Sequence, residues 1–268
     1  MDSQIGPRVK SLAFGAIAAS LAVAASAAHG PVLLRMKYKA GQTLKYALTM
    51  QLATSVNVNG GEQNIPARMT MQMVRHIVKV MPSGNAQATE SIENMKYMVN
   101  GNQFPTPATP SFTVVYSPLG TIVSMKTNGG SAQMKAMAGQ LTSPMQNAAV
   151  YLPKQAVSPG QSWVSSGKLP AVAGGGTYTV RSRFVKAEHV GGFPTVLIHS
   201  VMDAPIAVSQ AGGGTGELKM TSDSDFSPSA GKLIRVSGSG NMSMKVSNGP
   251  NGPMNMKIHM VLALSLLQ

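Results

Sequence analysis

The sequence predicts an all-β protein with one helical insert. We expect a large curved antiparallel sheet, or half-open barrel, made of two related meanders with the helix on its concave face. Apolar and polar residues alternate over residues 44–58, and further alternating segments follow between turn-forming stretches. Beyond the N-terminal region, helical spacing is convincing in one segment. Alternation gives each strand one apolar and one polar face, because successive side chains point in opposite directions.

The composition is that of a globular protein with a full core. Of its 268 residues, 43% are hydrophobic and 12% are charged, and a chain of this length forms one large all-β domain or two small ones. The absence of cysteine excludes a disulfide framework, a thiolate zinc site and a cysteine nucleophile. The net charge of +13 favours anionic partners electrostatically, although a basic exported protein without such a partner has the same composition.

Residues 1–27 have the features of a secretory signal peptide. Arg8 and Lys10 precede an apolar run over residues 11–24, and small residues end the segment at Ala27. We expect cleavage after Ala27 or one residue later; the alternative is an uncleaved membrane anchor. No cysteine follows the run, which excludes a lipoprotein. The predicted location is the periplasm or the exterior, without an integral membrane segment after cleavage, and nucleic acid is not an expected partner.

Residues 28–130 are expected to form the first β meander. A short strand over residues 32–38 leads into the long strand from residue 43 to residue 58. At about 3.4 Å per residue the long strand spans on the order of 50 Å, well beyond the usual strand of roughly 3–10 residues. The Asn-Gly-Gly sequence at 59–61 has the chemistry of a hairpin turn, because Asn and Gly tolerate positive φ.

The strand that returns from this turn alternates in two phases. Three methionines share one face and three valines the other: Met69, Met71 and Met73, then Val74, Val78 and Val80. The change of phase near Met73 predicts a β-bulge. Further strands are expected over residues 86–99, 112–116 and 122–126, separated by a proline-rich extended loop at 104–110 and a tight turn at 117–120.

Residues 131–151 form the predicted helical insert. Apolar residues fall at helical spacing from Met134 and Met137 onward. Pro144 should break the helix and open a second short one, because proline is tolerated in a first turn. We expect the helical region at 131–149 to pack on the concave face of the sheet.

Residues 152–268 are expected to form a second meander within the same integrated domain, because they repeat short patterns of the first half. The matches suggest duplication of a meander of roughly 110 residues; the alternative is that similar hairpins reuse similar turn chemistry. A long hairpin over residues 234–264 closes the chain, with methionines on one face and basic or polar residues on the other. The matching pairs are 40–44 with 159–163, 74–79 with 180–186, and 116–120 with 226–231.

The sequence contains no recognisable catalytic or cofactor-binding constellation. None of the acidic residues pairs with a histidine or serine nucleophile motif, and the histidines lack metal-ligand spacing. The glycine-rich stretch at 212–216 lacks the Gly-Lys-Ser/Thr ending of a phosphate loop and is predicted to be a flexible loop. We therefore expect a protein that is not an enzyme and carries no cofactor.

Methionine is unusually frequent, with 20 residues, many of them alternating on predicted strand faces. Three roles are open: core filling by an apolar, adaptable side chain, a thioether site for Cu(I), and a deformable lining for a hydrophobic ligand. The leading hypothesis is that the exported protein binds a hydrophobic or amphiphilic molecule, such as a lipid or acyl chain, between sheet and helix. The predicted lining residues are Met69, Met71, Met73, Met134, Met137, Met242, Met244, Met254, Met256 and Met260.

The basic residues give an alternative hypothesis, in which the chain is a structural or adhesion protein of the cell envelope. A basic face that includes Lys45, Lys245 and Lys257 would bind anionic glycan or lipid headgroups. Such binding should weaken steeply with salt, because exposed charges are screened over about 8–10 Å. Binding in an apolar cavity should be nearly independent of salt.

The order of long antiparallel strands, one helical insert and more strands behind an export signal resembles the periplasmic lipoprotein-carrier (LolA-like) half-barrel family. That resemblance implies a half-open sheet that wraps over helices and shelters an acyl chain. The pattern from Leu152-Pro153 through Pro159-Gly160-Gln161-Ser162-Trp163 is also similar to one in exported bacterial proteins of unknown function. The chain departs from the carrier family in having two similar halves and no receptor-docking signature, so cargo handover is not implied.

Overall fold

A computed structural model describes residues 30–58, 61–105, 111–128, 151–168, 176–208, 214–249 and 252–267. The chain divides into two units, Met1–Gly30 and Pro31–Gln268, and the account below concerns the second. None of the described residues is helical, and accordingly no membrane-spanning helix occurs among them. The predicted signal peptide and the predicted helix at 131–149 lie outside the described residues.

Among the described residues, twelve antiparallel strands form one open sheet, which confirms the all-β prediction. The first half of the chain contributes the strands on one side of the sheet. These are β1 (Thr43–Val58), β2 (Gly61–Val80), β3 (Ala86–Val99), β4 (Asn102–Phe104), β5 (Ser111–Tyr116) and β6 (Ile122–Asn128). The short β4 pairs with β3 alone, so Phe104, expected in a loop, ends a strand instead.

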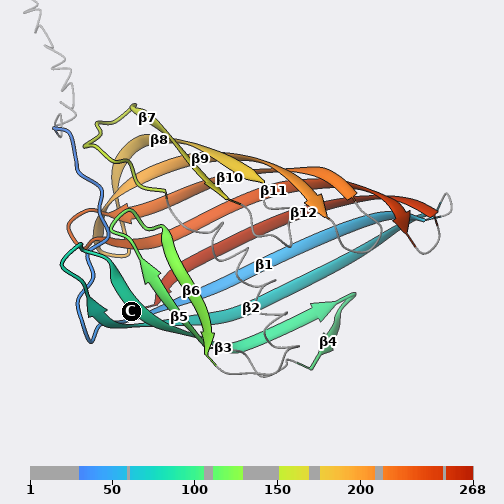
Figure 1. Ribbon diagram of the computed structural model, residues 1–268, viewed down its shortest axis with the longest axis horizontal. Coiled ribbons are helices and arrows are strands. Elements are labelled where there is room, and N and C mark those ends of the chain that lie inside the picture. The colour runs from blue at the N-terminus through green and yellow to red at the C-terminus, as the bar shows by residue number, and fades with distance from the viewer. Residues whose placement is uncertain are drawn as a thin grey trace, which may run out of the picture. The chain divides into compact units, whose positions relative to one another are not determined.

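The second half contributes the remaining strands, and the first and last strands of the chain meet between the halves. The sheet order is β6-β5-β3-β2-β1-β12-β11-β10-β9-β8-β7, and Figure 1 shows β1 beside β12. The first meander therefore runs outward from β1, and the second runs back inward to β12. The strands of the second half are β7 (Ser162–Lys168), β8 (Thr177–Val190), β9 (Phe193–Val208), β10 (Gly214–Ser227), β11 (Lys232–Gly249) and β12 (Gly252–Leu267).

The sheet has one apolar face, which we call the core face, and one polar face, which we call the solvent face. On β1 the core face carries Leu44, Tyr46 and Leu48, and the solvent face carries Lys45. Register extends this division to the neighbours, because Tyr46 pairs with Met73 on one side and Leu266 on the other. A single cluster of buried apolar residues runs across the core face from β5 to β8. The alternation in the sequence thus sets the face of each strand.

The two halves repeat the same local geometry where each meander begins. The Gly41 amide donates to the Ile77 carbonyl at 2.8 Å, and the Gly160 amide donates to the Phe184 carbonyl at 2.7 Å. Both glycines have positive φ, +78° and +86°. Register irregularities also recur at corresponding places: Ile77/Lys79 with Phe184/Lys186, and Val115/Tyr116 with Asp225/Phe226. The short sequence matches between the halves therefore fall on similar turns and bulges.

The predicted strand at 32–38 is wrong. The segment is extended, but its backbone bonds go to separate partners instead of one neighbouring strand. Val32 forms an isolated bridge with Val157, and the Lys37 amide donates to the Gly231 carbonyl at 3.0 Å. Leu34, with 0% exposure, anchors the segment in a second small core that includes Phe184 and Phe226. Residues 31–38 form a strap across turns, and we use that name below.

The predicted change of phase near Met73 is also wrong. Met73, Arg75 and Ile77 continue on the core face, while Val78 and Val80 are 48% and 40% exposed. The irregularities in the pairing of β2 with β3 lie on either side of that point, at Thr70/Gln72 and Ile77/Lys79. The same alternation continues through Arg75, because an arginine can occupy an inward position when a carboxylate on the next strand, here Glu90, faces it.

The contact between the strap and the turn at Gly231 requires glycine, so a substitution at Gly231 tests how firmly the strap is held. Its φ is +61°, and a Cβ there would lie 2.5 Å from the Lys37 amide nitrogen. Gly192 has φ +80° with nothing within 4 Å of a Cβ. We expect Gly192→Ala to lower the free energy of unfolding by about 1–2 kcal/mol through backbone conformation alone, and Gly231→Ala by at least about 1 kcal/mol more through overpacking.

Urea denaturation of the two variants measures this difference. Equal losses of stability would show that the strap moves aside without cost.

Candidate functional site

The core face is lined by methionine to an unusual degree. Ten methionines of the described segments belong to, or pack against, its apolar cluster: Met69, Met71, Met73, Met202 and Met220 are buried, and Met50, Met95, Met125, Met242 and Met260 are partly buried. They come from both halves of the sheet. The unbranched thioether side chain adapts its shape more readily than leucine or isoleucine, so this face is both apolar and deformable.

Gly240 brings two of these methionines together across β11. It stands in register between Met220 on β10 and Met260 on β12. A Cβ at this position would lie 2.6 Å from the Met220 Cγ and 3.4 Å from the Met260 Cγ. The missing side chain therefore leaves the space that the two flanking methionines occupy.

Eight of the ten predicted lining methionines are described, and all eight stand on the core face. They are spread along the strands, because Met71 pairs with Leu48 and Met256 pairs with Val56. Those two β1 positions are roughly 27 Å apart at ~3.4 Å per residue. The methionines therefore line a long surface instead of converging on one point, whereas a thioether metal site would need convergence. Met134 and Met137 lie outside the described residues.

Sequence reasoning missed five core-face methionines among the described residues: Met50, Met95, Met125, Met202 and Met220. Met50 pairs with Met69, and Met202 pairs with Met220 on the adjacent strand. Each occupies an inward position in an alternating segment, and from that position the sequence could have placed it on the core face. The omission arose because most of the predicted methionines were chosen from Met-x-Met runs, whereas these five lie outside such runs.

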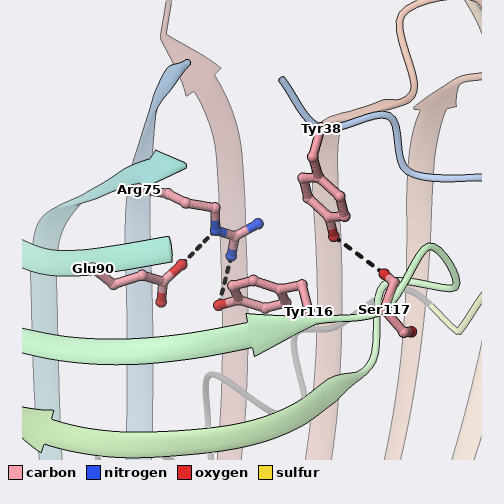
Figure 2. A network of polar contacts seen from close by, with 5 residues as sticks. All are labelled: Tyr38, Arg75, Glu90, Tyr116 and Ser117. Carbon is pink, nitrogen blue, oxygen red and sulfur yellow. Dashed lines mark hydrogen bonds and ion pairs between the residues drawn. The ribbon is translucent and has the colours of Figure 1, made fainter. Parts of the chain in front are cut away.

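Sequence reasoning also missed a buried ion pair on the core face. Arg75 on β2 donates from Nε to Glu90 on β3, and its Nη2 donates to the Tyr116 hydroxyl at 3.0 Å (Figure 2). The Arg75 guanidinium lies 4.0 Å from the centre of the Tyr116 ring and 5.9 Å from that of Tyr46. Tyr38 of the strap is tilted against Tyr116 and donates to the Ser117 carbonyl at 3.3 Å. We call Tyr38, Tyr46, Arg75, Glu90 and Tyr116 the arginine network.

Burial governs the protonation of this network. It raises the pKa of Tyr38, Tyr46 and Tyr116, and acting alone it would lower the pKa of Arg75. The Glu90 carboxylate and the tyrosines nevertheless hold the pKa of Arg75 well above its ordinary value. The guanidinium is therefore permanently charged and the phenols are neutral at physiological pH.

Two polar groups of the network have hydrogen-bonding capacity left over. The Tyr46 hydroxyl and Glu90 Oε2 are buried and have no hydrogen-bond partner among the described residues. Buried polar groups without partners are uncommon in folded proteins, so this part of the core face is the strongest candidate for recognition of a polar group.

The second half has a serine pair where the first half has the ion pair. Arg75 and Glu90 pair two residues from the Ile77 bulge, and Ser182 and Ser200 pair two residues from the equivalent Phe184 bulge. The Ser182 and Ser200 hydroxyls are 2.9 Å apart. Near the Ile77 bulge the core face therefore carries charged and aromatic side chains, and near the Phe184 bulge it carries small, neutral ones.

A hollow of about 620 Å³ lies between the β5–β6 turn and the segment that leads into β7. Leu119 lines one side, and Tyr151 and Trp163 line the other. The Trp163 Nε1 donates to the Tyr151 carbonyl at 2.7 Å, and the Leu152 amide donates to the Leu119 carbonyl at 3.3 Å. The bond between Leu152 and Leu119 ties the two ends of the open sheet together beside the hollow.

The three predicted basic residues are exposed on the solvent face, but they do not form one patch. Lys245 and Lys257 line a shallow hollow of about 700 Å³ together with Glu62 and Glu217. Lys45 pairs with Leu267, and Lys257 pairs with Ser55, ten positions farther along β1. Two lysines and two glutamates balance formally, so this hollow has mixed charge. No group of three or more metal-ligating residues occurs in the part of the chain that the structure describes.

Comparison with known proteins gives a likeness of fold. No protein-family model matches the chain, and no curated protein sequence matches it. A solved structure of lipovitellin, described for its lipid–protein interactions, is similar over 86% of this chain with a TM-score of 0.52 and 13% identity. The match covers 25% of the lipovitellin chain. A hypothetical lipoprotein of Escherichia coli, YmcC, aligns over 79% of this chain and 85% of its own with a TM-score of 0.19 and 11% identity.

The ion pair can be tested by removing one partner and then both. Arg75→Met leaves the Glu90 carboxylate, 2% exposed, without its cation, and we expect it to lower the free energy of unfolding by about 3–5 kcal/mol. The double variant Arg75→Met/Glu90→Met should recover most of that loss. Urea denaturation at neutral pH measures both; a double variant as unstable as the single one would contradict a buried pair.

The tyrosines predict a cooperative alkaline transition. Five of the six have a pKa raised by burial: Tyr38, Tyr46, Tyr116, Tyr151 and Tyr178. Because their folded pKa exceeds the unfolded value of about 10, their contribution to stability is complete below pH ~10 and is lost as the pH rises above it. Absorbance at 295 nm should therefore rise together with loss of the β-sheet circular dichroism signal.

The control is the protein in urea, in which all the tyrosines should ionise near pH ~10. Ionisation of those five in a protein that keeps its native circular dichroism would contradict their burial.

Proposed function

We propose that this chain is an exported, non-catalytic binding protein for a hydrophobic or amphiphilic molecule, such as a lipid or acyl chain, which it holds against the core face. The observation that carries the proposal is the gathering of ten methionines in one apolar cluster on a single face of the sheet. Flexible methionine surfaces accommodate apolar partners of varied shape. The likeness of fold to lipovitellin supports the same class of ligand.

The serine and glycine positions of the core face support an apolar ligand of some length. Ser182, Ser200, Ser222 and Gly238 follow one another in register across four strands. Because these side chains are small, they leave a shallow band beside the larger methionines. A chain of methylene groups that buries apolar surface there would gain about 25 cal/mol of free energy per Å².

The alternative, binding of anionic headgroups on the solvent face, has weaker support. The hollow that holds Lys245 and Lys257 also holds Glu62 and Glu217, so an anion gains little net attraction there. Salt separates the two functions. Raising the ionic strength from low to physiological should leave ligand binding nearly unchanged if it takes place on the core face, because apolar contacts are not screened.

The first experiment is native mass spectrometry with lipid extraction on protein purified from its own envelope. A stoichiometric co-purifying lipid would support the proposal and identify the ligand. A bare polypeptide from a gentle preparation, with no binding of a neutral apolar fluorophore such as N-phenyl-1-naphthylamine, would contradict it.

A matched pair of substitutions on β12 tests which face binds. Met260 points to the core face, and its neighbour Val261 is 41% exposed on the solvent face. Met260→Gln places an amide of similar size among apolar side chains, and we expect it to weaken N-phenyl-1-naphthylamine binding by about 5–30-fold, equivalent to roughly 1–2 kcal/mol. Val261→Gln should leave the affinity unchanged. Fluorescence titration measures both; equal effects would argue against binding at the core face.

A further inference from the structure

The strand β7 ends the sheet on one side and borders a hollow. Among the described residues β7 pairs with β8 alone, so its other edge has no neighbouring strand (Figure 1). The hollow of about 620 Å³ described above is lined by residues 151–157, residues 161–166, Leu119 and Thr121. We call this hollow the β7 groove.

The β7 groove runs along the edge of the strand and not over one of its faces. Successive side chains of a strand point to opposite faces, so a hollow on one face would be lined by alternate residues. The groove is instead lined by consecutive residues, from Gln161 through Ser166. Its lining therefore includes the edge of β7, where the backbone groups point.

The backbone of β7 has free hydrogen-bonding groups on this edge. The Phe184 amide donates to the Gln161 carbonyl at 3.0 Å, which makes these two residues a hydrogen-bonded pair. Bonded and non-bonded pairs alternate along antiparallel strands, so the amides and carbonyls of Ser162, Val164 and Ser166 point away from β8. Within the described segments no hydrogen bond reaches these outward groups. Each of the three residues offers one N–H and one C=O to a molecule in the groove.

An extended peptide is the occupant that suits these groups. A peptide that adds to a sheet edge exchanges backbone hydrogen bonds with it, whereas an acyl chain has no group that can do so. Residues 161–166 span roughly 20 Å at about 3.4 Å per residue, which matches a peptide of about six residues. Lys154 is the single charged residue of the described lining, so charge favours an acidic peptide over a basic one.

A second copy of this chain suits the groove less well. Pairing of two β7 strands would bring each strand into the groove of the other copy, where residues 151–157 already lie. The Val157 amide donates to the Val32 carbonyl at 3.0 Å, and the Arg35 guanidinium donates to the Pro153 carbonyl at 2.6 Å. Because these bonds hold the segment in place, the groove admits a single strand and not the edge of a second sheet.

We infer that the β7 groove binds an acidic segment of a partner protein, which adds to the sheet as an extended strand beside β7. The amides and carbonyls of the partner bond to those of Ser162, Val164 and Ser166. Trp163, which lines the groove, packs against the small core that includes Phe184 and not against the methionine cluster. The site is therefore separate from the methionine surface, and the inference goes beyond the proposed function without depending on it.

The test uses the peptide acetyl-Val-Glu-Val-Glu-Val-Glu-amide and the fluorescence of Trp163, the one tryptophan of the sequence. Because Trp163 lines the groove, its emission reports occupancy of this site. We expect the emission to shift to shorter wavelength and to saturate as peptide is added. The same peptide with every backbone nitrogen methylated should bind at least about tenfold more weakly, because it cannot donate to the edge.

A peptide with lysine in place of glutamate is the control for charge, and we expect it to bind at least about threefold more weakly. No saturable change in emission would overturn the inference. Equal binding of the methylated peptide would exclude strand addition, and equal binding of the lysine peptide would exclude an acidic partner. Each of these outcomes leaves the binding of N-phenyl-1-naphthylamine at the core face unaffected, so the proposed function is judged separately.

Val164→Pro tests the edge from the side of the protein. Val164 pairs with Arg181 as a non-bonded pair, so proline removes an outward N–H and leaves the bonds to β8 in place. The affinity for the glutamate peptide should fall at least about tenfold, whereas the matched control Val164→Thr should change it by less than about twofold.

The melting temperatures of both variants show whether they fold, and the methylated peptide decides the question on the wild-type protein if Val164→Pro does not. Unchanged affinity in folded Val164→Pro would overturn the inference. A wild-type dimer that Val164→Pro dissociates would overturn it as well, because the groove would then hold a second copy of the chain.

Discussion

The pairing of β1 with β12 is the interaction on which the rest of the fold depends. It joins the two meanders into one sheet, and its register aligns the core face of one half with that of the other. Tyr46, Leu48 and Met50 are in line with Leu266, Leu264 and Leu262. A shift of one residue would turn every core-face side chain of one half toward solvent. The methionine surface is continuous across both halves only because this register holds.

The arginine network and the methionine surface together form a face that is apolar over most of its area and carries charge at one place. Glycine and serine in the second half reduce the bulk of the same face, as at Gly240, where Met220 and Met260 meet. The two halves share their turns and bulges but differ in what they present: a charged pair at Arg75 and Glu90, and hydroxyls at Ser182 and Ser200.

Much of the sheet could be predicted from the sequence, because the alternation of apolar and polar residues within each strand shows which of its faces is buried. The long β1 strand, its hairpin with β2 and the closing hairpin of β11 and β12 follow directly. The arginine network was not predicted, although Arg75 follows Met73 at inward spacing and Glu90 follows Ala88 in the same way. Two opposite charges at inward positions on consecutive strands were the signal. The strap was misjudged because its partners are distant turns, such as the one at Gly231, which no local pattern specifies.

The order of the strands in the sheet also has a consequence in time. β1 is made first and β12 last, yet they are neighbours, so the central pair cannot form until nearly the whole chain is available. Contacts this distant in sequence slow folding, because a long loop must close before they contribute. Until then β1 presents a long unpaired edge with an apolar face, which is the kind of surface that binds other chains. A protein with this topology needs protection from aggregation for longer than one whose terminal strands lie at opposite edges.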